Sequence, residues 1–515
     1  MISRLNQWFE FYKNDNKALR VLKKIDSNLE QNRDFFDKPF YNERGFIFFE
    51  KLGNHGFNEF IISLVVQAFV NLVSDVEDLN ILVAYNNNDD LDHYADLTHQ
   101  ILSQKNFKVF RFENTQILPS VVNEAYNNIS FDAAFYFNYQ SEQNKYRLTI
   151  FDGQGVSVNL NVYEQIANMI LHMNPNTDVR KIRKAPIYLK EQEIFAQYKN
   201  KIISLAKRNN DEKKISVYLA NASKSFTHLA GKILGSLDFE YNISKHKIPN
   251  LFAFRPLNWY LRDATKTGSD LLYITDTSGT KLGVAISIGN KFKFLEEVEL
   301  LILFLDLYLL DLKTKRLLSD KNYIVIPNYL IILLQEIIIK YQIKAYPIEK
   351  FDNKKLDKTY LLFSMNRDNL FKFNSPSVNY YDQLQFIVIF SELMNYYKTQ
   401  RGALANVLNH TLSLYKQIYQ IKDRFITNEE NAQRLISEIA NGLFKEIVNQ
   451  VNIYANETYF MIINPENDFL IRLEFKPFTN FLYFQIFDLT GKKQIDIVNK
   501  IHSQINTWIK NANKG

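Results

Sequence analysis

The chain has 515 residues, a mass of 60.7 kDa and no cysteine, which excludes disulfides, zinc–thiolate sites and cysteine nucleophiles. Its 62 basic and 56 acidic side chains leave a net charge of +6, a weak excess over this length that does not indicate nucleic-acid binding. Local basic clusters are short and typical of a solvated surface, as in Arg180, Lys181, Arg183 and Lys184.

Hydrophobic segments predict a protein that does not insert into a membrane. The N-terminus carries no apolar signal core. The most apolar run, Leu300 to Leu312, contains Asp306 and Asp311 and is too short to cross a bilayer, so it predicts a buried helix. The lack of cysteine fits a reducing compartment, and we expect a cytoplasmic protein. The abundance of Asn, Lys and Ile is typical of an AT-rich genome and suggests a small-genome bacterium.

Helices and strands alternate through the first third of the chain. Helical periodicity covers residues 5–36. The pattern then predicts helices over 60–72 and 91–102, and strands over 80–84, 108–112, 131–137 and 147–151. This order is typical of βαβ units, so we expect a largely parallel sheet covered by helices.

The same alternation begins again at about residue 196 and once more at about residue 291. The second stretch predicts helices over 195–206, 226–234 and 257–267, with strands over 214–219 and 271–275. The third predicts helices over 300–312, 329–340 and 385–397, with a strand over 323–326.

The last stretch has a different pattern. It predicts a helix over 432–451, strands around Tyr459, Ile471 and Phe484, and a helix over 495–509. We therefore expect an α/β protein of three α/β domains and a C-terminal α+β domain, with boundaries at 1–195, 196–290, 291–425 and 426–515.

Two runs resemble motifs of a known family. Ile81 to Ala95 reads ILVAYNNN before a helical pattern, and Gly268 to Val284 reads GSDLLYITDTSGTKLGV. They resemble the strand VVIGYDSR and the metal loop GADLLLANDPDADR of the α-D-phosphohexomutases, the phosphoglucomutase and phosphomannomutase family. Further matches follow in the same order over nearly the whole chain. The resemblance implies that family's four-domain architecture.

The catalytic loop of the family reads TASHNP…YNGYK, and its serine carries the transferable phosphoryl group. In this chain the run from Asn144 to Arg147 resembles NGYK, and counting back without gaps gives the phosphoserine position to Phe137. Asn138 takes the histidine position, and the nearest hydroxyl, Ser141, is out of register. Phosphoryl transfer requires a hydroxyl nucleophile in line with the donor phosphate, which a phenyl ring cannot supply. The resemblance implies no catalytic residue here.

The metal loop of the family carries three aspartates. The register keeps the first as Asp276, while Ser278 and Thr280 take the other two positions and Lys281 takes that of an arginine. Magnesium prefers several oxygen ligands, carboxylates above all. We therefore expect no metal site, and a turn or cap role for Asp276.

The loops for sugar and for phosphate have also changed. The two glutamates of the sugar loop become Ser364 and Met365, although the helix that follows keeps its match at Asp382. In the phosphate loop RPSGTEPK, Lys476 replaces the arginine, and Ser-Gly-Thr becomes Phe-Thr-Asn. Lys476 keeps the positive charge but cannot form the two parallel hydrogen bonds that an arginine guanidinium donates, so it is a weak candidate for binding substrate phosphate.

Loss at four separate loops, each between matched scaffold segments, predicts a retained fold without the mutase chemistry. The leading hypothesis is a pseudoenzyme without cofactor. It would serve as a structural or regulatory subunit of a larger bacterial assembly, such as ATPase-linked, cytoskeletal or motility machinery. We expect protein partners at the aromatic-rich loops of the former site or at the N-terminal helix, and not a small phosphosugar.

Two alternatives stay open. The chain could be a residual phosphosugar mutase with Ser141 as phosphate acceptor, or a sensor that binds a phosphosugar without turnover. The eight histidines show no HExxH or paired metal spacing, and no glycine-rich phosphate loop or GxSxG motif is present in the sequence.

Overall fold

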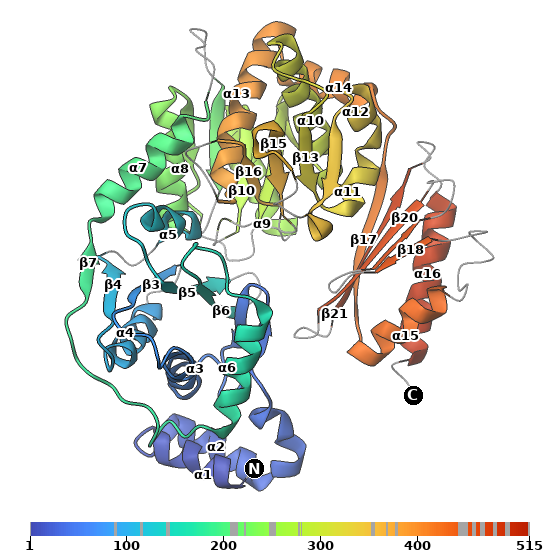
Figure 1. Ribbon diagram of the computed structural model, residues 1–515. Coiled ribbons are helices and arrows are strands. Elements are labelled where there is room, and N and C mark those ends of the chain that lie inside the picture. Colours follow the sequence, from blue (N-terminus) through green and yellow to red (C-terminus); the bar gives the residue numbers. More distant parts are fainter. Residues whose placement is uncertain are drawn as a thin grey trace. The chain divides into compact units, whose positions relative to one another are not determined.

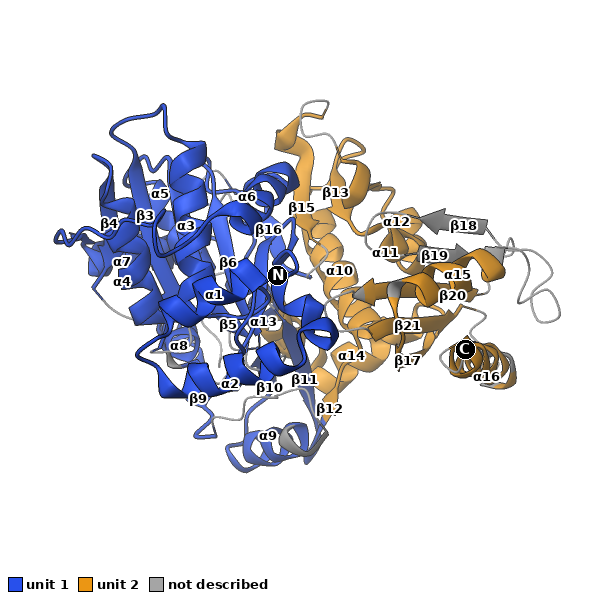
Figure 2. Ribbon diagram, turned by 90° about the horizontal axis from the view of Figure 1, so that it is seen from below, with its two compact units in different colours: residues 1–292, 368–392 blue, residues 293–367, 393–515 orange. Residues whose placement is uncertain are grey.

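The computed structural model divides the chain into two compact units, one of residues 1–292 and 368–392 and the other of residues 293–367 and 393–515 (Figure 2). The described residues are 2–86, 90–113, 117–140, 145–206, 215–220, 223–246, 254–276, 279, 281–351, 356–366, 369–375, 380–440, 452–455, 460–463, 469–476, 481–489 and 495–512.

The first sheet of unit 1 has the strand order β1-β2-β6-β5-β3-β4-β7. Strands β3, β4, β5 and β7 are parallel, whereas β2 and β6 are antiparallel to their neighbours. The prediction of a largely parallel sheet is only partly right, because short loops join β1 to β2 and β5 to β6 and impose antiparallel pairing. The elements are α1 (Ile2–Phe11), α2 (Asn16–Ser27), β1 (Phe40–Asn42), β2 (Gly45–Phe49), α3 (Glu59–Leu72), β3 (Asn80–Asn86), α4 (Leu91–Leu102), β4 (Lys108–Phe112), α5 (Pro119–Tyr126), β5 (Ala133–Gln140), β6 (Lys145–Phe151), α6 (Leu160–His172) and β7 (Ile187–Leu189).

The helical pattern over 5–36 forms α1, α2 and a 3₁₀ helix over Leu29–Phe36. The carboxylate of Asp15 caps α2 by accepting hydrogen bonds from two backbone N–H groups in its first turn. The helical pattern is therefore divided between α1 and α2 at this residue. The Trp8 ring of α1 is fully buried and stacks on Phe60 at a centroid distance of 3.8 Å. The aromatic side of the N-terminal helix is thus used inside unit 1.

The main core of unit 1 lies between this sheet and helices α3, α4 and α6, while α5 covers the opposite face (Figure 1). Helix α3 is apolar almost throughout, and its side chains are buried from Phe60 to Val70. The side chain of Asn58 caps it by accepting a hydrogen bond from the Ile61 N–H at 3.0 Å. A helix buried on all sides explains why its apolar residues show little amphipathic pattern.

The second sheet, whose strands β8, β9, β10 and β11 belong to unit 1, has the order β12-β11-β10-β8-β9. Strands β8, β9 and β10 are parallel, and β11 returns antiparallel to β10. Its elements, with the helix that leads into it, are α7 (Glu191–Ile203), β8 (Ser216–Ala220), α8 (Lys224–Ser236), β9 (Glu240–Ile243), α9 (Phe254–Lys266), β10 (Leu271–Thr275), β11 (Leu282–Ile288) and β12 (Lys291–Phe294).

The third sheet has the order β14-β13-β15-β16, with β13, β14 and β15 parallel. Residues 368–392, which include β16 and the first half of α13, are assigned to unit 1. The elements of this third sheet and its neighbouring helices are α10 (Glu297–Thr314), β13 (Tyr323–Ile326), α11 (Asn328–Leu333), α12 (Gln335–Lys340), β14 (Lys344–Pro347), β15 (Leu361–Met365), β16 (Phe371–Phe373), α13 (Gln383–Arg401) and α14 (Leu404–Ser413).

The apolar run over 300–312 lies in α10, a largely buried helix, as predicted. Its buried Asp306 accepts hydrogen bonds from Lys340 Nζ and from the Tyr341 hydroxyl, both at 2.8 Å, so the charge is paired. Within the described ranges, no helix combines the length and the apolar composition needed to cross a bilayer.

The C-terminal sheet of unit 2 is antiparallel with the order β17-β21-β20-β19-β18. Helices α15 and α16 share its core. The four domain boundaries stay a prediction. The elements are β17 (Tyr419–Ile426), α15 (Glu429–Ala440), β18 (Asn452–Ala455), β19 (Phe460–Ile463), β20 (Phe469–Lys476), β21 (Phe481–Asp488) and α16 (Ile495–Ala512).

Candidate functional site

Phe137, the residue at the expected phosphoserine position, lies inside strand β5. It pairs with Tyr85 of β3 on one side and with Leu148 of β6 on the other. Its side chain is 0% exposed and meets the Phe57 ring edge-to-face at 6.2 Å. The β5–β6 hairpin stays paired as far as Gln140 and Lys145, so position 137 is in a strand and not in a loop. Ser141 lies outside the described residues.

Polar side chains form a row on the opposite face of the same strands. Asn86 of β3 pairs with Asn138 of β5, which in turn pairs with Arg147 of β6. Asn86 is 0% and Asn138 5% exposed. The Oδ1 atom of Asn138 and both amide atoms of Asn86 make no well-formed hydrogen bond among the described residues. Burial raises the pKa of the neighbouring Tyr136 hydroxyl well above its usual range, while interaction with the Asn86 side chain acts to lower it.

Asp276, the remaining aspartate of the expected metal loop, holds its own turn together. Its carboxylate is 3% exposed, and Oδ1 accepts a hydrogen bond from the Lys281 N–H at 2.9 Å. Its backbone carbonyl accepts from the Gly279 N–H, also at 2.9 Å. Ser278 and Thr280 lie outside the described residues, and they bring no carboxylate. This donor set does not suit Mg²⁺, which prefers several oxygen ligands.

The positions of the other two family loops are only partly described. Ser364 and Met365 are buried residues at the end of strand β15. Lys476 is the last residue of β20 and pairs in register with Phe481 of β21. Its side chain and residues 477–480 lie outside the described residues, so phosphate binding by Lys476 stays a prediction.

A buried polar cluster that the sequence did not predict joins α5 and α7 to the start of α13. The Tyr198 hydroxyl donates a hydrogen bond to Asp382 Oδ2, and the Leu384 N–H donates to Asp382 Oδ1 at 3.0 Å. Burial raises the pKa of Asp382 to about 6 despite these hydrogen bonds. Asp382 therefore acts as a scaffold residue that fixes the beginning of α13.

An ion pair extends this cluster. The Glu124 carboxylate of α5 is 0% exposed and lies 2.8 Å from Lys201 Nζ of α7. The rings of Tyr198 and Tyr380 stack at 6.0 Å, and burial raises the pKa of Tyr380 well above its usual range. Glu124 and Lys201 are 77 residues apart in the chain, and Tyr198 and Asp382 are 184 apart, so no local pattern could have predicted either contact.

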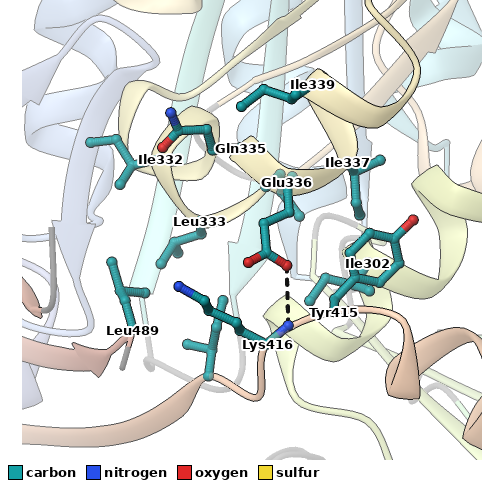
Figure 3. A pocket seen from close by; sticks show the side chains of 12 residues that line it. Ile302, Ile332, Leu333, Gln335, Glu336, Ile337, Ile339, Tyr415, Lys416 and Leu489 are labelled. Atoms are coloured by element: carbon teal, nitrogen blue, oxygen red, sulfur yellow. Dashed lines mark hydrogen bonds between the residues drawn. The ribbon is translucent and has the colours of Figure 1, made fainter. Parts of the chain in front are cut away.

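Unit 2 contains a hollow of about 220 Å³ lined mainly by isoleucine and leucine side chains of α10, α11 and α12 (Figure 3). On one side the Glu336 carboxylate accepts a hydrogen bond from the Lys416 N–H at 3.1 Å. The lining residues do not include Ser364 or Lys476, so the hollow is not the site that the motifs predicted. Within the described residues, no group of His, Asp and Glu side chains is placed to hold a metal ion.

Comparison with known proteins gives matches in structure and not in sequence. No protein-family model and no curated protein matches this sequence. A phosphoglucomutase/phosphomannomutase family protein from Burkholderia thailandensis is similar at 11% identity and a TM-score of 0.65, over 92% of this chain and 97% of that one.

Parafusin, a phosphoglucomutase from Paramecium, is similar in its open form at 9% identity and a TM-score of 0.63, over 92% of this chain and 95% of that one. Identities this low establish a common fold and do not establish activity. The similarity extends over nearly the full length of both proteins, as the sequence motifs predicted. The chain therefore has the multi-domain α/β fold of the α-D-phosphohexomutases.

Proposed function

We propose that this chain is a phosphohexomutase homologue that no longer catalyses phosphoryl transfer and instead serves as a binding subunit of a larger bacterial assembly. ATPase-linked, cytoskeletal or motility machinery would be such an assembly. The burial of Phe137 within a paired strand is the observation that carries the proposal. A nucleophile must reach a phosphate from an accessible loop, and a core phenyl ring offers neither access nor a hydroxyl.

The role of Asp276 in its own turn also supports the loss of catalysis. Its carboxylate already accepts the Lys281 N–H, which fixes the turn between β10 and β11. The resemblance gives the other two aspartate positions to residues with hydroxyls. The chain would thus have kept residues that hold the scaffold and lost those that hold the substrate and its metal.

A coupled mutase assay tests the loss of activity. With glucose-1-phosphate, mannose-1-phosphate or ribose-1-phosphate and Mg²⁺, we expect no turnover above the enzyme-free blank. Turnover that disappears in Ser141→Ala would contradict the proposal and favour the residual mutase. Isolation of the protein from its native cell tests the proposed role as a binding subunit. Such a subunit should co-purify with stoichiometric partners, and a lone monomer would argue against that role.

The row Asn86, Asn138 and Arg147 favours a second candidate, a phosphosugar sensor without turnover. Asn86 is the last residue of β3 and Asn138 lies near the carboxyl end of the adjacent strand β5, and open α/β sheets bind ligands at such ends. A buried amide without a partner costs about 1–3 kcal/mol, so a polar ligand that satisfied these groups would gain affinity. Arg147 would supply a positive charge that suits phosphate.

The sensor makes a specific prediction for Asn138→Leu. Without ligand, the variant should melt close to or above the wild-type temperature, because the substitution removes a buried amide oxygen that makes no well-formed hydrogen bond among the described residues. With glucose-1-phosphate, only the wild-type chain should show a midpoint that rises with concentration. Phe137→Leu, on the opposite face of the strand, is the matched control and should keep the shift. No shift for the wild-type chain with any of the three sugar phosphates excludes the sensor.

A further inference from the structure

An exposed segment leads from α6 into the edge strand of the first sheet. Residues 174–190 pass around the outside of α4 to β7 (Figure 1). The segment is attached to α4, because the Ile182 N–H donates to the Gln100 carbonyl at 2.9 Å and His99 Nε2 lies 2.8 Å from the Lys184 carbonyl. Strand β7 is last in the sheet order, so its outer edge has no neighbouring strand among the described residues.

The segment also carries uncompensated positive charge. Residues 174–190 contain five cations and one carboxylate, that of Asp178, which accepts the Asn174 N–H at 2.7 Å; the fifth cation, Lys190, pairs with Glu193 at 3.2 Å. We define the basic edge as β7 together with four exposed cations that have no carboxylate partner in the described part of the chain, namely Arg180, Lys181, Arg183 and Lys184.

Apolar side chains are exposed on the basic edge as well. Ile187 is 44% and Tyr188 55% exposed, although both belong to the strand. Proteins usually protect a free strand edge, because it offers unpaired N–H and C=O groups to another chain. The cations would repel a second copy of the same edge and attract a segment of opposite charge. The combination therefore disfavours self-association and suits an acidic partner.

We propose that the basic edge docks an extended acidic segment of a partner protein, which joins the first sheet as a strand beside β7. The free backbone edge decides in favour of a polypeptide, because an anionic membrane or an RNA could use the cations but not the row of N–H and C=O groups. The inference rests on the proposed function, since it gives a binding subunit the chemical class of its partner.

Fluorescence anisotropy of the full chain with a labelled peptide of alternating Glu and Val tests this docking. Reversal of the four cations to Glu (R180E, K181E, R183E, K184E) should weaken binding about tenfold or more, and added salt should weaken it for the wild-type chain. A peptide of alternating Lys and Val should not bind.

The matched control reverses four exposed cations of α2, namely Lys17, Arg20, Lys23 and Lys24. This variant should bind the acidic peptide within about twofold of the wild-type chain, since the proposed strand pairs with β7 and not with α2, and exposed charges are screened beyond about 8 Å at physiological salt. Equal loss in both variants, or no loss in the basic-edge variant, overturns the proposal. Circular dichroism confirms that both variants are folded.

Hydrogen exchange tests the strand pairing itself. The amides of 187–189 should gain protection when the acidic peptide binds, because a new strand would take up those on the outer edge. Binding without this protection overturns strand addition. Tighter binding of phosphatidylserine vesicles or of single-stranded RNA than of the peptide overturns the choice of occupant.

These results are separable from the proposed function. Mutase turnover would contradict the loss of catalysis and leave the peptide measurements untouched. A stoichiometric assembly from the native cell that forms equally well with the basic-edge variant would keep the binding subunit and reject this surface.

Discussion

Replacing Phe137 with serine should destabilise unit 1 by about 3–5 kcal/mol, the usual loss when a buried aromatic ring is truncated. The ring is fully buried between paired strands and contacts Phe57, so its removal leaves a cavity in the main core. The substitution places a hydroxyl at the position that the resemblance predicts for the family's phosphoserine. We nevertheless expect no mutase turnover, because that hydroxyl would face the core.

Hydrogen exchange of the β3, β5 and β6 amides is the appropriate measurement, since a chain of two units need not unfold in a single step. Phe137→Leu is the control and should cost only about 1 kcal/mol, as volume-conserving apolar changes do. A serine variant that is as stable as the wild-type chain would contradict the burial. Turnover in that variant would show that the site can still be rebuilt.

Replacing Lys201 with methionine should be similarly damaging, by about 3–5 kcal/mol, because it leaves a buried carboxylate without its cation. Glu124 is fully buried and lies 2.8 Å from Lys201 Nζ, so its charge depends on that cation. The loss should appear as a lower midpoint in thermal or urea denaturation, together with faster exchange in α5 and α7.

The double variant Lys201→Met, Glu124→Gln should recover most of the loss, since no unpaired charge would remain. Lys190→Met is the control, because that lysine is at the start of α7 but its pair with Glu193 is exposed. It should change stability little. A Lys201 variant that behaves like the Lys190 variant would mean that the buried pair contributes nothing.

Regular elements with a strong local pattern could be predicted from the sequence. Helix α4 and strands β4, β10 and β13 have the predicted bounds. The apolar residues of each element recur with the period of its helix or strand geometry, and polar or turn residues follow its last position.

Elements that depend on distant partners could not be predicted. Strand β17 pairs along its whole length with β21, about sixty residues later, and Phe425 is its one buried residue, so it lacks an apolar pattern. The predicted helix over 329–340 is divided at Leu334 into α11 and α12, since the continuous apolar run carries no sign of the break. The edge strands β7 and β9 are short, and backbone pairing alone defines them.

The sequence by itself determined the fold class, through its apolar periodicity and ordered family motifs, and the resemblance predicted Phe137 at the family's phosphoserine position and Asp276 in its metal loop. Residue identity is local information, and so is the lack of a hydroxyl or of a second carboxylate. Only the tertiary structure decided that Phe137 lies within a paired strand, that Asp276 holds its turn and that Glu124 meets Lys201. Strand register, burial and ion pairing arise between segments far apart in the chain, and no short pattern encodes them.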